Sequence, residues 1–201
     1  MNSLGQFIIK PLKERYNNEI KVGDKSLITN TSVEDWRSVS KEAIVVAVPL
    51  AIKTDIKVGD KVIVHHNIFR RWYDVRGNER NGSTFFKEDK YFANIDQIYL
   101  YCQNKEWKAN LEYCFVSPVK ETDDLENKKE KDLVGVLKYG NKSLEALKII
   151  PGAIIGFTPK SEFEFVFEGK RLYCMKSNDI VIKYEDKGNE EEYNPSWAYS
   201  R

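Results

Sequence analysis

The sequence is poor in the residues that build disulfide, redox and metal sites. Among 201 residues it has three cysteines and two histidines. Cys102, Cys114 and Cys174 are odd in number, widely spaced and set among apolar neighbours, which is typical neither of a disulfide framework nor of a zinc site. We expect them to be reduced core residues. His65 and His66 are adjacent in a predicted strand, so their side chains should point to opposite faces and could not easily share one metal ion.

The sequence also lacks an excess of either charge and any long apolar run. Its 32 basic and 31 acidic residues leave a net charge of +1, so no global field attracts nucleic acid or anionic lipid. No stretch approaches the roughly 20 apolar residues of a membrane span, and the first residues hold no apolar run long enough for a signal peptide. These absences predict a soluble, cytoplasmic protein whose local surfaces select its partners.

Patterns that indicate catalysis are missing as well. No Ser, Cys or Thr is accompanied in the sequence by a base and an orienting carboxylate. The glycines form neither a phosphate-binding loop nor a dinucleotide fingerprint. We therefore expect a protein that is not an enzyme and that binds no cofactor.

Short strand patterns fill most of the chain, separated by Gly, Pro, Asn and Asp. Phe163, Phe165 and Phe167 alternate with other residues at period two, which is typical of a half-buried strand, and residues 168–170 then predict a tight hairpin turn. A helix is suggested only at residues 143–147. The other predicted strands are Ala43–Val48, Val62–Val64, Ile98–Cys102, Ile154–Phe157 and Ile180–Ile182. The pattern favours an all-β fold.

The strand patterns occur twice in the same order, which indicates an internal repeat. The first pair of matching segments keeps proline, lysine and glutamate in step, and the second pair shares a glycine turn before an apolar strand. The three matches are residues 7–14 with 115–121, residues 57–64 with 150–157, and residues 98–101 with 172–175. We therefore predict two diverged copies of one small β-barrel domain in tandem.

The two copies differ in their connections. In the first copy, residues 17–41 form a polar stretch of a length that is usually functional or disordered. Its counterpart in the second copy, residues 121–132, is shorter and densely charged. The first copy also carries an inserted hairpin, which we assign to residues 75–91. The predicted domains are residues 1–114 and 115–185, followed by a polar tail at residues 186–201.

These motifs resemble those of the GroES-like co-chaperonins. The first copy has I-K-P-L at residues 9–12, a long loop and K-V-G-D-K-V-I-V at residues 57–64, which is similar to the N-terminal strand, mobile loop and K-V-G-D-x-V turn of that family. The second copy has P-G-A-I-I-G-F and L-Y-C-M-K-S-N-D-I, which are similar to the family's P-G-D-x-V-x-F turn and its terminal strand. Plastids have tandem co-chaperonins and phages encode divergent ones, so the arrangement fits either lineage.

The resemblance implies a self-associating ring that caps a GroEL-type chaperonin, itself the partner that binds ATP, and encloses a folding chamber. In that family a mobile loop docks on the chaperonin through a short aliphatic segment. The matching chaperonin-binding residues are Ser26, Leu27, Ile28 and Thr29. Two exposed aliphatics bind weakly, and a ring of such loops gains avidity. Since the second copy's loop has Leu125 as its one apolar residue, only the first copy is expected to dock.

The inserted hairpin matches the position of the family's roof hairpin, which implies a roof or chamber-wall role for Arg76, Arg80, Phe85 and Phe86. Two other functions stay open. A structural or assembly protein, for example a phage particle component, could keep the barrel and lose the docking loop. The basic and aromatic residues at 69–73 are also typical of single-strand nucleic-acid binders, although four acidic neighbours weaken their positive field.

Overall fold

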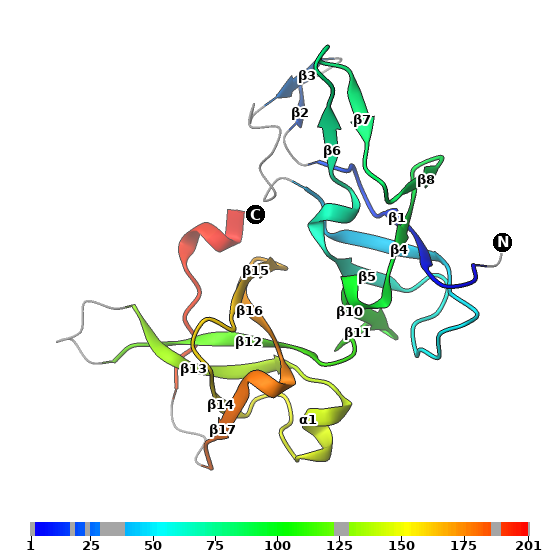
Figure 1. The fold of residues 1–201 in the computed structure, drawn as a ribbon. Helices are drawn as coiled ribbons and strands as arrows, with labels where there is room; N and C mark the ends of the chain where they lie inside the picture. The colour runs from blue at the N-terminus through cyan, green and yellow to red at the C-terminus, as the bar shows by residue number, and fades with distance from the viewer. Residues whose placement is uncertain are drawn as a thin grey trace. The chain divides into compact units, whose positions relative to one another are not determined.

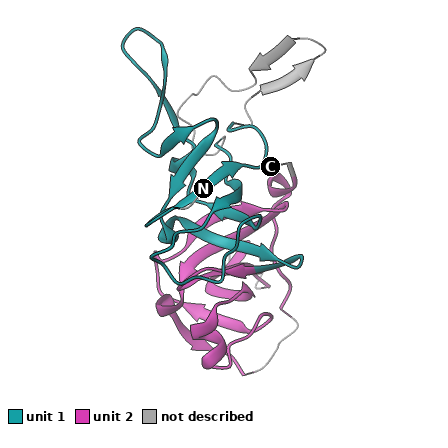
Figure 2. Ribbon diagram, turned by 90° about the vertical axis from the view of Figure 1, so that its right-hand side faces the viewer, with its two compact units in different colours: residues 1–107 teal, residues 108–201 magenta. Residues whose placement is uncertain are grey.

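The computed structural model describes residues 3–16, 19–22, 25–28, 39–122, 129–185 and 190–200. Most elements in these residues are strands, which confirms the all-β fold class. The chain folds as two compact units, residues 1–107 and 108–201, drawn in different colours in Figure 2. The predicted division lay a few residues later, at residue 114, where the structure has the start of a strand.

Unit 1 is built on a seven-stranded sheet in the order β11-β10-β5-β4-β1-β9-β8 (Figure 1). Two hairpins are separate from this sheet: β2 (Glu19–Val22) with β3 (Lys25–Ile28), and β6 (Arg71–Tyr73) with β7 (Glu79–Asn81). Two 3-10 turns, η2 (His66–Ile68) and η3 (Ile95–Gln97), connect strands. The sheet strands are β1 (Phe7–Pro11), β4 (Glu42–Ala47), β5 (Lys61–Val64), β8 (Phe85–Lys87), β9 (Lys90–Ala93), β10 (Ile98–Gln103) and β11 (Glu106–Ala109).

Unit 2 is built on a six-stranded sheet in the order β15-β16-β12-β13-β14-β17. The helix α1 (Lys142–Ala146) begins where the Asn141 side chain accepts a hydrogen bond from the Leu144 N–H, which confirms the predicted helix. The hairpin turn at Glu168 and Gly169 is confirmed as well, because both residues have positive φ. The strands are β12 (Tyr113–Lys120), β13 (Glu130–Tyr139), β14 (Ile154–Phe157), β15 (Phe163–Phe167), β16 (Lys170–Lys176) and β17 (Ile180–Lys183).

The two sheets have the same strand order. In unit 1 the order β10-β5-β4-β1-β9-β8 corresponds strand by strand to β17-β14-β13-β12-β16-β15 in unit 2. The register also agrees, and each first strand has a register shift at the same place, between Ile8 and Ile9 and between Phe115 and Val116. Ile9 of β1 pairs with Val45 and Tyr91 on its two sides. At the equivalent position in unit 2, Val116 pairs with Leu137 and Tyr173. This agreement is what a tandem duplication produces.

One of the three predicted segment matches is wrong. Residues 98–101 were matched to residues 172–175, but the structure makes β10 equivalent to β17 and β9 equivalent to β16. The match was misleading because β10 and β16 both contain tyrosine among apolar residues. Their pairing partners differ, since β9 and β16 pair with the first strand of their unit, whereas β10 and β17 pair with β5 and β14.

The correct match changes the position of the extra residues in unit 1. The predicted insertion, residues 75–91, runs into β8 and β9, which belong to the main sheet and have counterparts in unit 2. The extra stretch is instead residues 65–84 between β5 and β8, since residues 158–162 make the same connection in unit 2. The β6–β7 hairpin lies inside this extra stretch.

The described strand orders leave both sheets open. In the residues that the structure describes, β11 and β8 end one sheet, and β15 and β17 end the other. The prediction of two closed barrels therefore gains no support from the pairing. No helix in the same residues is long and apolar enough to cross a membrane.

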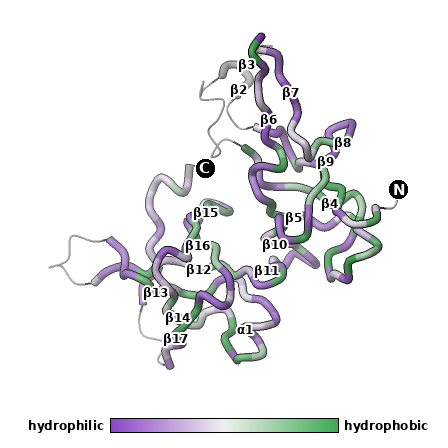
Figure 3. The backbone as a smooth tube through the Cα atoms, viewed as in Figure 1, coloured by the Kyte–Doolittle hydropathy of each residue, from purple (hydrophilic) through white to green (hydrophobic). Residues whose placement is uncertain are grey.

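Each unit has its own apolar core, and Figure 3 shows hydrophobic residues concentrated along the sheet strands. In unit 1 the Phe69 ring meets the Tyr91 ring edge-on, with 4.9 Å between centroids. In unit 2, Phe115 and Phe165 make the same kind of contact at 5.6 Å. The cysteines are free thiols, as predicted. Cys114 and Cys174 are buried, whereas Cys102 is only half-buried.

The C-terminal tail is attached to unit 2 over residues 190–199. The Lys120 N–H donates to the Glu191 carbonyl, and the Tyr193 N–H donates to the Pro118 carbonyl, so the tail continues the pairing of β12. Ala198 is fully buried. Three consecutive ion pairs join Glu190 to Lys131, Glu191 to Lys120 and Glu192 to Lys138.

Candidate functional site

The predicted chaperonin-binding residues fall between β1 and β4 of unit 1. Ser26, Leu27 and Ile28 belong to β3 (Lys25–Ile28), which pairs with β2 (Glu19–Val22) as a two-stranded hairpin. Thr29 lies outside the described residues. The stretch that the sequence predicted as a loop thus contains a short pair of antiparallel strands, residues 19–22 with residues 25–28.

Both ends of this stretch are anchored at one place in unit 1. Tyr16 and Val39 form an antiparallel bridge, and both side chains are buried in the core. The Ser40 N–H donates to the Arg15 carbonyl at 2.8 Å. The chain therefore leaves and re-enters the fold at neighbouring positions, so the β2–β3 hairpin belongs to a single excursion from the sheet.

A second hairpin, formed by β6 (Arg71–Tyr73) and β7 (Glu79–Asn81), extends from unit 1 (Figure 1). Asp74 organises its turn: the carboxylate accepts from the Arg76 and Asn78 N–H groups, both at 2.9 Å, and from the Arg80 guanidinium at 3.0 Å. These hydrogen bonds, that of Asn78 foremost, lower the pKa of Asp74. The turn is thus fixed by one ionised side chain.

The four predicted wall residues belong to two different parts of unit 1. Arg76 is exposed in the turn, and Arg80 is paired with Asp74. Phe85 is partly buried against the unit 1 core, where its ring meets that of Tyr91 at 5.4 Å. Phe86 is exposed on the other face of β8. The arginines therefore belong to the hairpin, whereas the phenylalanines belong to the main sheet.

Sequence reasoning missed the residues that hold the base of the β6–β7 hairpin. The Arg15 guanidinium donates to the Phe69 carbonyl at 3.0 Å and to the Asn81 side chain at 2.9 Å. The Tyr16 hydroxyl accepts from the Arg71 N–H at 2.8 Å, and the Arg71 guanidinium lies 4.3 Å from the Tyr16 ring centroid. No local pattern could reveal these contacts, because they join residues more than 50 positions apart.

The charges of this hairpin are largely paired. Glu79 lies 3.1 Å from the Arg71 guanidinium and 3.6 Å from that of Arg15. With Arg80 paired to Asp74, both acidic residues of the hairpin face arginines. This pairing weakens the nucleic-acid alternative, which depends on a free positive field beside aromatic residues.

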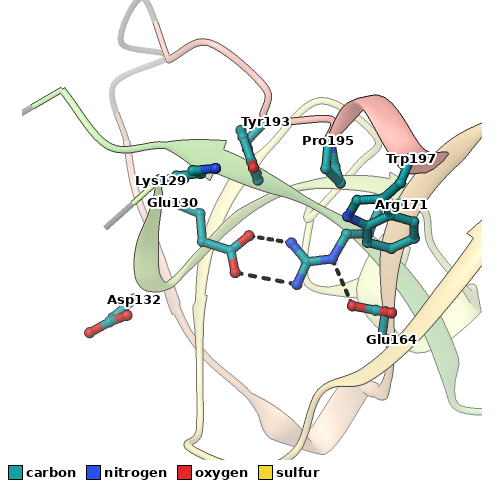
Figure 4. Close-up of a pocket in the computed structure, with 8 residues that line it drawn as sticks. All are labelled: Lys129, Glu130, Asp132, Glu164, Arg171, Tyr193, Pro195 and Trp197. Carbon is teal, nitrogen blue, oxygen red and sulfur yellow. Dashed lines mark hydrogen bonds and ion pairs between the residues drawn. The ribbon is translucent and has the colours of Figure 1, made fainter. Parts of the chain in front are cut away.

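Unit 2 contains a pocket of about 430 Å³ that the sequence did not predict (Figure 4). Arg171 is its central group: its guanidinium contacts Glu130 at 2.5 Å and Glu164 at 2.9 Å. The Tyr173 hydroxyl donates to Glu130 at 2.7 Å, and burial raises the pKa of Tyr173. The tail supplies Tyr193, Pro195 and Trp197 to the lining.

The chemistry of this pocket indicates a structural role. Glu130 and Glu164 both point at Arg171 in Figure 4, and these ion pairs join β13, β15 and β16. The cluster therefore links three strands of unit 2. Removing one partner would destabilise the unit, because a half-buried charge would be left uncompensated.

The prediction that the side chains of His65 and His66 point to opposite faces is wrong. Their rings are stacked with centroids 4.4 Å apart, because β5 ends at Val64 and His66 begins the 3-10 turn η2. The His65 Nδ1 accepts the Asn67 N–H. Within the described part of the chain, no three His, Cys, Asp or Glu residues gather closely enough to hold a metal ion.

His66 makes the stability of unit 1 depend on pH. Burial, followed by the charges of His65, Lys41 and Arg70, lowers its pKa to about 4. Because the unfolded chain binds the proton at about pH 6.5, stability falls as pH drops from about 6.5 to 4. The pKa difference alone corresponds to a loss of about 3 kcal/mol in the free energy of unfolding. Because the side chain is only partly buried and solvent screens its charge, we expect a loss of about 1–2 kcal/mol.

We expect the free energy of unfolding, measured with urea, to fall between pH 7 and pH 4.5 in both proteins. The fall should be about 1 kcal/mol smaller in a His66→Gln variant than in the wild type. Carboxylates that titrate in the same range affect both proteins equally, so the difference isolates His66. An equal loss in the two proteins would contradict the assignment.

Comparison with models of known protein families finds no match for this chain. A search of curated proteins finds no significant match either.

Proposed function

We propose that the protein is a co-chaperonin that caps a GroEL-type chaperonin ring and assists protein folding in the enclosed space. The observation that carries the proposal is the long excursion between β1 and β4, which contains residues 26–28 and whose two ends meet at the Tyr16–Val39 bridge. In this proposal the two sheets are walls of two GroES-like barrels, the copies of the chain form a ring, and the protein acts in the cytoplasm.

The matched strand order of the two units supports a duplicated co-chaperonin subunit. Only unit 1 has the long excursion, because residues 121–129 make the equivalent connection between β12 and β13. Docking is therefore assigned to unit 1. Unit 2 completes the ring or raises the chamber wall.

The chemistry of the docking segment suits reversible capping. Burying two aliphatic side chains at about 25 cal/mol per Å² yields a few kcal/mol. Ordering the segment offsets part of this gain. A single contact is weak, but several such segments in one ring bind together, so avidity produces a tight cap that releases when the chaperonin groove changes.

A structural or assembly protein, such as a phage particle component, is the alternative function. The pairing of β2 with β3 favours it, because a hairpin that already has regular strands resembles a fixed structural arm more than a loop that folds on its partner. The two functions differ in one respect that can be measured: only the co-chaperonin binds a chaperonin in a nucleotide-dependent manner.

Co-sedimentation with a bacterial GroEL-type chaperonin, with and without ATP, tests the proposal. We expect the protein to sediment with the chaperonin when ATP is present and to remain in the supernatant without it. Binding without nucleotide would indicate an unfolded client rather than a cap. Failure of the folded protein to bind in either condition would favour the structural protein.

A further inference from the structure

The β6–β7 hairpin ends in an asparagine that is followed by glycine. Asn81 is the last residue of β7, and it is exposed. Gly82 begins the connection to β8 and belongs to no strand. Asparagine before glycine is prone to spontaneous loss of its side-chain amide, because glycine has no Cβ that hinders closure of a ring between the two residues. No other Asn-Gly pair occurs in the sequence.

The main-chain nitrogen that attacks the amide in this reaction is accessible for it. Ring closure begins when the Gly82 nitrogen loses its proton and adds to the Asn81 side chain, so a hydrogen bond donated by this N–H would have to break first. Among the hydrogen bonds of the described residues, none is donated by the Gly82 N–H. The pairing of β6 with β7 also ends at Asn81. The strand pairing therefore does not hold the attacking atom.

The side-chain amide of Asn81 is polarised by Arg15. The guanidinium donates to the Asn81 Oδ1 at 2.9 Å, and this oxygen is the atom on which negative charge develops when Cγ is attacked. Two hydrogen bonds to the Phe69 carbonyl, at 3.0 and 3.2 Å, hold the guanidinium in place. The contact uses the carbonyl oxygen of the amide and not the nitrogen that leaves, so it favours the attack.

We propose that Asn81 is a site of spontaneous deamidation in the folded protein. The Gly82 nitrogen forms a bond to the Asn81 Cγ, the bond from Cγ to Nδ2 breaks, and ammonia leaves with the proton that the Gly82 nitrogen lost. One water molecule then opens the resulting succinimide at either of its carbonyl groups, which yields aspartate or isoaspartate. The reaction consumes water alone, with no oxidant, reductant or enzyme.

The aspartate product would strengthen the contact with Arg15. Its carboxylate takes the position of the Asn81 amide, whereas Glu79 lies farther from the same guanidinium, at 3.6 Å. The change leaves 32 acidic and 32 basic residues, so the net charge falls from +1 to zero. Ion-exchange chromatography therefore separates the product from the unmodified protein.

The isoaspartate product would instead weaken the base of the hairpin. It inserts one carbon of the former side chain into the main chain after Asn81, whose carbonyl oxygen accepts from the Trp72 indole N–H at 3.2 Å. The excursion between β1 and β4 is anchored at the same place, because the Arg15 carbonyl accepts from the Ser40 N–H. This inference goes beyond the proposed function and does not depend on chaperonin binding.

Peptide mapping by tandem mass spectrometry tests the inference on the folded, full-length protein after incubation at physiological temperature and mildly alkaline pH. We expect conversion of Asn81 to aspartate and isoaspartate, at a rate within about tenfold of that in a synthetic peptide of residues 76–86, because exposed hairpin ends open readily. Asn78, which is exposed in the same hairpin but precedes Glu79, should stay unmodified. If Asn81 stays intact in the protein while the peptide reacts, the inference is overturned.

Two variants test the mechanism. Gly82→Ala should slow the reaction by about tenfold, because the added methyl group hinders ring closure. The φ of Gly82 lies outside the left-handed region, so alanine can adopt it, although its Cβ would lie 3.2 Å from the Arg70 carbonyl oxygen. Asn81→Gln keeps an amide for Arg15 and should stop the reaction, since its longer side chain would have to close a larger ring. Thermal unfolding checks that both variants fold. An unchanged rate in folded Gly82→Ala would contradict attack by the Gly82 nitrogen.

Discussion

Replacing Leu27 and Ile28 together with aspartate is expected to abolish nucleotide-dependent binding to the chaperonin. Burial of each aliphatic side chain contributes about 1.5–3 kcal/mol, so each contact in the ring should weaken by at least tenfold. Because the contacts act together, this loss multiplies around the ring. Co-sedimentation with ATP should therefore show less than about a tenth of the wild-type binding.

Leu125→Asp is the matched control for this double substitution. It places the same charge in the equivalent connection of unit 2, at that connection's one apolar residue. If docking belongs to unit 1 alone, Leu125→Asp should bind like wild type. Equal losses in the two variants would place docking in both units, and wild-type binding by the double variant would remove residues 27 and 28 from the docking surface.

Substitution of Gly135 is expected to have the largest effect on stability. This buried residue lies in β13, and a Cβ there would come within 2.3 Å of Val116 Cγ1 and 2.7 Å of the Ser117 carbonyl oxygen. The equivalent position in unit 1 is the buried Ala43, so the close approach belongs to unit 2 only. We expect Gly135→Ala to destabilise unit 2 by about 1–3 kcal/mol, which lowers its unfolding temperature by about 10 °C.

Gly140→Ala provides the comparison in the same unit. Its Cβ would meet its nearest atom, Leu137 Cδ2, at 3.4 Å, an ordinary contact. Its effect should stay within about 0.5 kcal/mol. Differential scanning calorimetry separates the two variants. A Gly135→Ala protein as stable as Gly140→Ala would show that β12 and β13 are less closely packed at this point than the structure indicates.

Local patterns were enough to predict the repeat and part of the strands, but not β13 or the β2–β3 hairpin. Period-two alternation marked β15, and glycine turns located β5 and β14, because these features arise from residues next to one another in the chain. The match between residues 98–101 and 172–175 failed because it compared letters without pairing partners. Equivalent strands are defined by their neighbours in the sheet, and a single sequence does not contain that information directly.

The groups that organise the candidate sites were harder to predict. Arg15 reaches Phe69 and Asn81, and Arg171 reaches Glu130, so each contact depends on strand order that only the folded chain reveals. The stacked histidines show a different limit. Both histidines were treated as strand residues, but β5 ends at Val64, and the 3-10 turn that follows brings their rings together.

Electron microscopy of the protein with a GroEL-type chaperonin and ATP tests the central claim most directly. The account predicts added density across the open end of the chaperonin ring, contacting it at the groove-bearing rim, and loss of that density for the Leu27→Asp, Ile28→Asp variant. Chaperonin ends that stay bare with folded wild-type protein present, or density confined to the inside of the ring as for a client, would contradict it.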